Sequence, residues 1–100
     1  MAIRYLVRRN SPYALDDMRH KFPNLEEQLG MPNESLRKSL KYSFSPVRYA
    51  LYTFLPRKSG TTWSWVCPSI ELVAEDEKGL FALTEQLGVP EPSHLSHLPA

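Results

Sequence analysis

The chain has 100 residues, of which 42% are apolar and 23% charged, with 9 prolines, 4 glycines and one cysteine. Its length allows one small domain, and its apolar fraction is too high for a disordered protein. One cysteine excludes an internal disulfide and a zinc site built on several thiolates. No apolar run is long enough to span a bilayer. The N-terminus, MAIRYLVRR, lacks the features of a signal peptide, so we expect a cytoplasmic protein.

The net charge of +1 conceals two oppositely charged parts. Residues 1–66 hold eleven Lys or Arg and five Asp or Glu, whereas residues 67–100 hold one Lys and six acids. The basic part suits a polyanionic partner such as nucleic acid. The asymmetry equally suits attraction between the two parts, within one fold or between subunits, and the sequence leaves both interpretations open.

The segment Ile3–Arg9 predicts a short strand, because apolar residues and arginines alternate along it. Ile3, Tyr5 and Val7 share one side, and Arg4 and Arg8 share the other.

Three helices are expected next. Ser11-Pro12 starts a helix over residues 12–22, in which Leu15, Met18 and Phe22 form an apolar stripe. A second short helix over residues 24–29 ends at Gly30, which tolerates the left-handed conformation. The third helix spans residues 33–43.

Seven of the eleven aromatic residues lie between residues 42 and 65 and predict a β-hairpin. Its strands are expected over Val47–Leu55 and Thr61–Val66, and a helix beginning at Ser45-Pro46 is the alternative. A four-residue turn places Phe54 opposite Trp63 and Tyr52 opposite Trp65.

The expected fold is therefore α+β, with three to four short helices, an N-terminal strand and an aromatic β-hairpin. Ile70–Val73 extends the sheet, and a last helix spans residues 77–87. Residues 1–90 form a single compact domain in this prediction, and residues 91–100 form a tail that contains proline and histidine.

Residues 25–40, LEEQLGMPNESLRKSL, and residues 83–98, LTEQLGVPEPSHLSHL, agree at eight of sixteen positions. In the first copy, leucines pack two helices and Gly30 makes the turn between them. With this order of residue types, Leu25–Leu40 resembles the helix-turn-helix of DNA-binding regulators, and the basic hairpin after it resembles the wing of winged-helix proteins. The chain departs from the family at Glu26, where a small residue is usual.

The resemblance implies a regulator that places the helix 33–43 in the major groove of double-stranded DNA. In this arrangement Arg37 reads guanine and Asn33 reads adenine, whereas lysines contact phosphates. The implied DNA-contacting residues on this helix and at the wing tip are Asn33, Arg37, Lys38, Lys41, Arg57 and Lys58.

A second hypothesis comes from the aromatic residues Tyr52, Trp63 and Trp65, which are of the types enriched at protein interfaces. It describes a small inhibitor, such as an anti-activator or a phage-type anti-defence protein, that docks on a larger protein target. The same residues serve equally as a homodimer surface or as plain core.

Catalysis is not expected. Cys67, His94 and His97 are three potential metal ligands, but prolines on both sides of the histidines disfavour a regular helix there. The chain has neither a phosphate-binding glycine loop nor a nucleotide fingerprint. We therefore expect a non-enzymatic protein without metal or cofactor.

Overall fold

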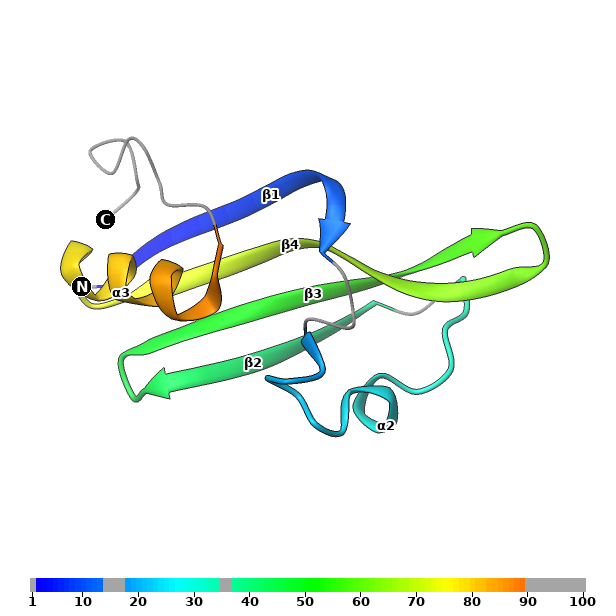
Figure 1. Ribbon diagram of the computed structural model, residues 1–100, viewed down its shortest axis with the longest axis horizontal. Coiled ribbons are helices and arrows are strands. Elements are labelled where there is room, and N and C mark those ends of the chain that lie inside the picture. The colour runs from blue at the N-terminus through cyan, green and yellow to red at the C-terminus, as the bar shows by residue number, and fades with distance from the viewer. Residues whose placement is uncertain (1, 14–17, 35–36, 90–100) are drawn as a thin grey trace.

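The computed structural model describes residues 2–13, 18–34 and 37–89, with the backbone alone for residues 9–13. These ranges contain β1 (Ile3–Tyr13), α2 (Leu25–Leu29), β2 (Lys38–Ser45), β3 (Arg48–Ser59), β4 (Thr62–Ala74) and α3 (Glu77–Leu87). The four strands form one antiparallel sheet in the order β1-β4-β3-β2 (Figure 1). The expected α+β fold with three to four short helices is therefore wrong, because the described residues are mostly sheet and one of their two helices has only five residues.

The largest error concerns residues 33–43, which were expected to be helical. Lys38–Ser45 is instead the strand β2, which pairs with β3. Leu40 and Tyr42 pack against the core, and Lys41 between them points to the opposite face. Leucines spaced by four suit a helix, but this alternation suits a strand, and β3 satisfies the backbone groups of one edge of β2.

The helix expected over residues 12–22 is also wrong in its first part, because β1 continues through Pro12 to Tyr13. Leu15 lies outside the described residues. Met18 is helical and residues 19–21 form a turn, and the Phe22 N–H donates to the Met18 carbonyl at 2.9 Å. Met18 and Phe22 are nevertheless buried, as the predicted apolar stripe indicated.

The N-terminal strand and the remaining two helices are confirmed. Helix α2 ends at Gly30, whose backbone φ of 73° is one that residues with a side chain rarely adopt. Helix α3 starts at Asp76, whose carboxylate accepts a hydrogen bond from the Gly79 N–H at 2.8 Å. It ends at Gly88 in the left-handed conformation.

The hairpin is confirmed, and the alternative helix from Ser45-Pro46 is wrong, but the predicted register is shifted. Gly60 and Thr61 make a two-residue turn, so the ladder continues almost to the tip. Trp63 consequently pairs with Lys58, and Trp65 pairs with Pro56.

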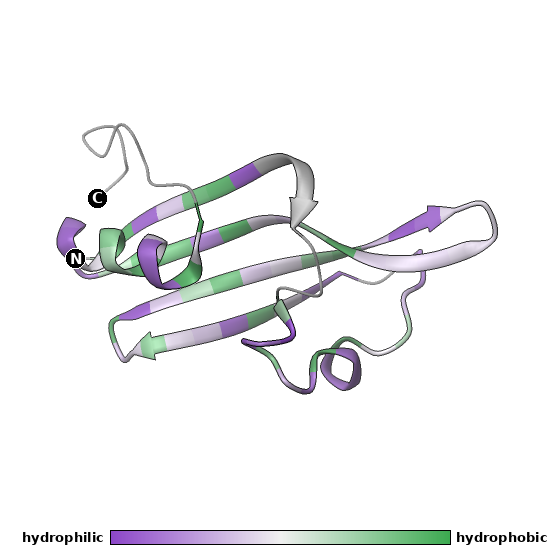
Figure 2. Cartoon of the chain, in the orientation of Figure 1, coloured by the Kyte–Doolittle hydropathy of each residue, from purple (hydrophilic) through white to green (hydrophobic). Residues whose placement is uncertain are grey.

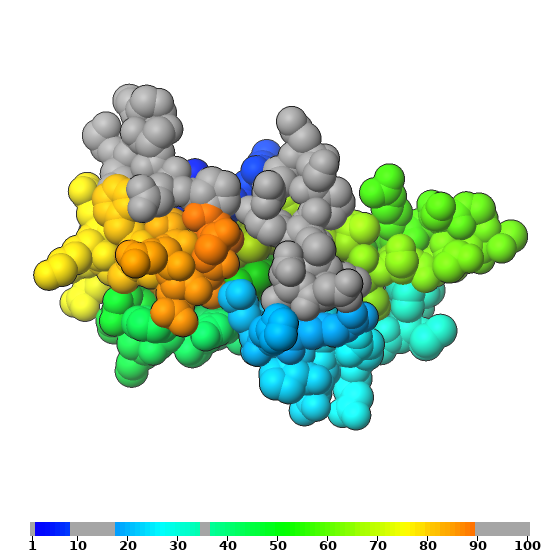
Figure 3. Space-filling model, viewed as in Figure 1, coloured from blue at the N-terminus to red at the C-terminus, as the bar shows by residue number. Residues whose placement is uncertain are grey.

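The end of the hairpin forms an arm, Leu55–Val66, in which β3 and β4 pair only with each other among the described residues. A register shift at its base places Cys67 and Pro68 together opposite Phe54. Proline has no N–H to donate, so a bulge is a position that suits it in a central strand. The arm projects beyond the sheet (Figures 1 and 3).

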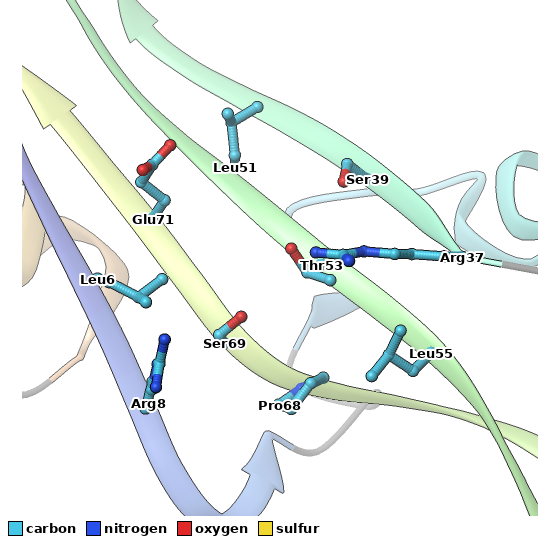
Figure 4. A pocket seen from close by; sticks show the side chains of 10 residues that line it. All are labelled: Leu6, Arg8, Arg37, Ser39, Leu51, Thr53, Leu55, Pro68, Ser69 and Glu71. Atoms are coloured by element: carbon cyan, nitrogen blue, oxygen red, sulfur yellow. The ribbon is translucent and has the colours of Figure 1, made fainter.

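One side of the sheet, the covered face, packs against α3 and the segment 18–34 (Figure 3). Alternate residues of each strand point to this side, which gives the alternating colours along the strands in Figure 2. The core contains apolar side chains from all of these parts, including Val7, Leu25, Leu29, Tyr52, Phe54, Ile70, Leu72, Leu80, Leu83 and Leu87. The opposite side of the sheet is the open face, over which no helix in the described ranges lies (Figure 4).

Candidate functional site

The six residues predicted to contact DNA do not share a helix, and the strands divide them between the two faces. Arg37 lies directly before β2, and its guanidinium extends across the open face toward Thr53 (Figure 4). Lys41 pairs with Leu51 on the same face. Arg57 follows Leu55 by two residues along β3 and continues that face onto the arm.

The other three predicted residues point elsewhere. Lys38 lies on the covered side, where its ammonium donates to the Gln28 carbonyl at 3.5 Å. Lys58 lies across the ladder from Trp63, with its Nζ 5.8 Å from the ring centroid. Asn33 is exposed in the connection between α2 and β2. The predicted site is therefore split, and only its arginines and Lys41 come together on one surface.

The aromatic residues predicted as an interface belong mainly to the core. Tyr52 is 2% exposed and meets Phe22 edge to face, with 5.1 Å between the ring centroids. Trp65 is 8% exposed, and its indole N–H donates to the Gly30 carbonyl at 2.9 Å. This bond fastens the connection after α2 to the base of the arm. Trp63 remains half-buried, so of the three it alone has substantial accessible surface.

The open face contains a shallow trough with a volume of about 540 Å³. Its floor comes from the two central strands, β3 and β4, and from β1, and it mixes aliphatic side chains with hydroxyl groups (Figure 4). The lining side chains of the floor are Leu6, Leu51, Thr53, Leu55, Pro68 and Ser69. Leu6 is 42% exposed, which is high for a leucine on a sheet.

Cations stand along both edges of this trough. Arg8 on the edge strand β1 and Arg37 at the opposite edge line the trough. Arg4 and Lys41 extend these two rims along the same face of β1 and β2. Their positive charges face one carboxylate among the described residues of the trough, Glu71, which accepts a hydrogen bond from Arg4 at 3.4 Å. The trough therefore has an aliphatic floor between two positively charged rims, and it attracts negatively charged groups.

Charge is distributed unequally between the two sides of the sheet. The exposed carboxylates of α2 and α3 lie on the helical side, and they are Glu26, Glu27, Glu77 and Glu85. The open face carries most of its charge as arginine and lysine. These four carboxylates do not neutralise the cationic rims, because the sheet lies between them, whereas Glu71 on the open face pairs with Arg4.

The described residues offer neither a reactive thiol nor a cluster of metal ligands. Burial raises the pKa of the Cys67 thiol to about 12, so almost no reactive thiolate exists at neutral pH. The thiol donates to the Ser69 carbonyl at a sulfur–oxygen distance of 3.4 Å. Within the described ranges no three His, Cys, Asp or Glu side chains gather as a metal site, and His94 and His97 lie outside those ranges.

Sequence reasoning missed the trough because it assigned residues 33–43 to a helix. One signal was present: the alternation in Ile3–Arg9 already placed Arg4 and Arg8 on one side of a strand, and the structure confirms it. Leu51 and Leu55 had no such signal, since an aliphatic residue in a central strand usually reads as core.

No protein-family model matches the chain, and neither a curated protein nor a solved structure is significantly similar to it. None of the helices in the described part of the chain is long and apolar enough to cross a membrane.

Proposed function

We propose that this chain is a non-enzymatic cytoplasmic binding protein that docks the open face of its sheet on a larger protein and inhibits it by blocking a surface. One observation carries the proposal: an aliphatic floor lies between two cationic rims on a face that no described helix covers. Protein interfaces commonly combine an apolar centre with a charged rim, and arginine is enriched in them.

The aliphatic floor is what favours a protein over nucleic acid. The binding free energy becomes more favourable through Leu6, Leu51 and Leu55 only when another apolar surface removes them from water. A phosphate backbone presents charged oxygen atoms, and against these the leucines would lose water without gaining contacts. A protein partner can satisfy the leucines and the arginines together.

Double-stranded DNA is retained as the second candidate because of the arm. Arg37, Lys41 and Arg57 lie on one face that runs from β2 to the arm. A two-stranded ribbon such as the arm fits the DNA major groove, which is about 12 Å wide. This arrangement replaces the helix that the resemblance implied, because residues 38–45 are extended.

A charge-matched pair of variants tests the proposal. Arg37→Glu reverses a charge at the trough, and Lys78→Glu makes the same reversal on α3, where the side chain is exposed. Wild-type protein and both variants are immobilised and exposed to a nuclease-treated lysate of the source cells. We expect a protein that wild type and Lys78→Glu retain and Arg37→Glu loses. Equal retention by all three proteins would contradict docking through the open face.

Salt dependence separates the two candidates. Binding to a fluorescent DNA duplex is followed by anisotropy as the salt concentration rises. Several phosphate contacts predict an affinity that falls steeply with the logarithm of the salt concentration. The DNA candidate replaces the protein candidate under two conditions. Arg37→Glu and Arg57→Glu abolish the binding to the duplex, and the protein captures partners from an untreated lysate but none from the nuclease-treated one.

A further inference from the structure

The width of the open face constrains what can lie on it. Three interstrand spacings separate β1 from β2, which amounts to about 14 Å at about 4.8 Å each. The cationic side chains stand on these outer strands, and the leucines of β3 lie between them. An α-helix with its side chains has a diameter of about 10–12 Å, so one helix fills the floor between the rims.

An extended segment fits this surface less well. The face of a sheet presents side chains, since the backbone hydrogen-bonding groups point along the plane to neighbouring strands. A strand lying on the trough would leave its own N–H and C=O groups without partners when the floor became dry. A helix satisfies those groups internally and can be buried without this cost. The covered face of the same sheet already packs a helix, α3, through leucines.

The rims determine the charge of the occupant. Arg8 on one side and Arg37 on the other line the trough, and a guanidinium binds a carboxylate through two parallel hydrogen bonds. Lys41 lies further along the second rim, beyond Ser39, with its Nζ 4.1 Å from the centroid of the Tyr49 ring. A complementary helix has carboxylates on both flanks of its apolar stripe.

We infer that the trough binds an amphipathic α-helix of the partner, with a leucine-rich stripe on Leu6, Leu51 and Leu55 and acidic residues on both flanks. This inference rests on the proposed function and names the partner's chemistry. The leucine stripe supplies apolar burial, and the flanking Glu or Asp residues pair with Arg8, Arg37 and Lys41. Glu71 stays paired with Arg4 at the edge of the floor.

Two synthetic peptides of identical composition test the inference. Each is about 18 residues long, which gives a helix of about 27 Å. In the first, leucines recur at i, i+3, i+4 and i+7 with glutamates on both sides. In the second, the same residues are shuffled so that no stripe forms. We expect the striped peptide to bind about tenfold more tightly or better, measured by fluorescence anisotropy.

The chain's variants locate the binding. Arg8→Glu and Arg37→Glu are each expected to weaken the striped peptide about tenfold, and Lys78→Glu is expected to leave its affinity unchanged. Leu51→Ala gives a milder loss with no change of charge. In NMR spectra, the striped peptide should shift the methyl signals of Leu6, Leu51 and Leu55 and leave those of Leu80 and Leu83 in place. Thermal melts of each variant verify that it is folded.

The outcomes separate the inference from the proposed function. Equal binding of both peptides, or no methyl shift at the floor, would overturn the helix while protein capture through Arg37 still stands. Capture that ignores Arg37→Glu would overturn the proposed function as well. A dimer of the wild-type chain that Arg37→Glu dissociates in light scattering would replace the partner helix with a second copy, and the inference would be wrong.

Discussion

The covered and open faces are built from the same four strands, yet their side chains have different surroundings. Along β4, Ile70 and Leu72 point into the core and are at most 1% exposed, whereas Ser69 and Glu71 between them face the trough and remain partly accessible. Both faces contain leucines. On the covered face, α3 and the segment 18–34 remove them from water; on the open face, the described residues provide no such cover.

This difference indicates that the two faces serve different ends. The covered face supplies the apolar burial that stabilises a domain of this size. The open face keeps arginines and leucines accessible, which contributes little to folding and suits a partner. The contrast predicts that substitutions on the covered face change stability, and that substitutions on the open face change binding.

The largest expected effect separates the faces by stability. Phe54 is fully buried, and Phe54→Ala removes a ring from the core, so it should lower the free energy of unfolding by about 3–5 kcal/mol. Leu51→Ala, on the opposite side of the same strand, should cost about 1 kcal/mol because Leu51 is only half-buried. Urea denaturation measures both values. Similar losses would mean that the open face is covered in solution.

The next effect concerns Cys67, at the bulge on the covered face. Its pKa is raised by burial from the ordinary 9.0 to about 12, so alkylation at pH 8 should be about 10³-fold slower than in the unfolded chain. Above pH 9 the unfolded thiol ionises and the folded thiol does not, so stability falls as the pH rises from 9 toward 12.

Cys67→Ala provides the control for this prediction. It removes the contribution of the thiol to the pH dependence, so its free energy of unfolding should fall less than that of wild type between pH 8 and pH 10. Rapid alkylation of the folded wild-type protein would show that the base of the arm opens readily.

A smaller effect tests the helix that covers the sheet. Asp76→Ala removes the carboxylate that accepts the Gly79 N–H, and it should destabilise the protein by about 1 kcal/mol. Asp76→Asn keeps an acceptor at the same place and should cost only a fraction of this. Because α3 packs on the covered face alone, neither variant should change the affinity of the striped peptide for the trough. A loss of that affinity would show that the two faces are coupled.

The sequence predicted local features better than their assembly. Asp76 and Gly88 bound a helix through interactions within a few residues, and such signals are readable. The helix prediction failed for residues 38–43. Leu36 and Leu40 have a helical spacing, whereas Leu40 and Tyr42 have the spacing of a strand, which is stable only when it pairs with β3. β3 follows β2 directly after the turn at Pro46-Val47, so this pairing is a local hairpin, but the strand is favoured over a helix only when β3 is beside it.

The candidate site was unpredictable because its rims come from strands that lie far apart in the chain. Arg8 and Arg37 lie 29 positions apart in the sequence, and they line one trough only because β4 and β3 lie between their strands. The hairpin was readable from its aromatic residues, but its register was not, since a two-residue turn at Gly60 and a longer turn fit the same sequence.

The smallest expected effect concerns the outer surface of the helical side. The Arg19 guanidinium donates to the Glu26 carboxylate and lowers its pKa below the ordinary 4.5. The contribution of this pair to stability is present above the unfolded pKa and is lost as the pH falls through the lowered pKa. Both side chains are about half exposed or more, so water and salt screen the pair.

Arg19→Ala should therefore raise the pKa of Glu26 toward 4.5, as followed by NMR titration, and leave the urea midpoint unchanged within error. Lys21→Ala, a nearby change of the same charge, should leave the pKa of Glu26 where it is. Salt at about 1 M should reproduce the effect of Arg19→Ala, because the Debye length is then about 3 Å. If the pKa of Glu26 stayed lowered in such salt, the Arg19–Glu26 pair would be shielded from solvent, and the outer surface of α2 would be covered in solution.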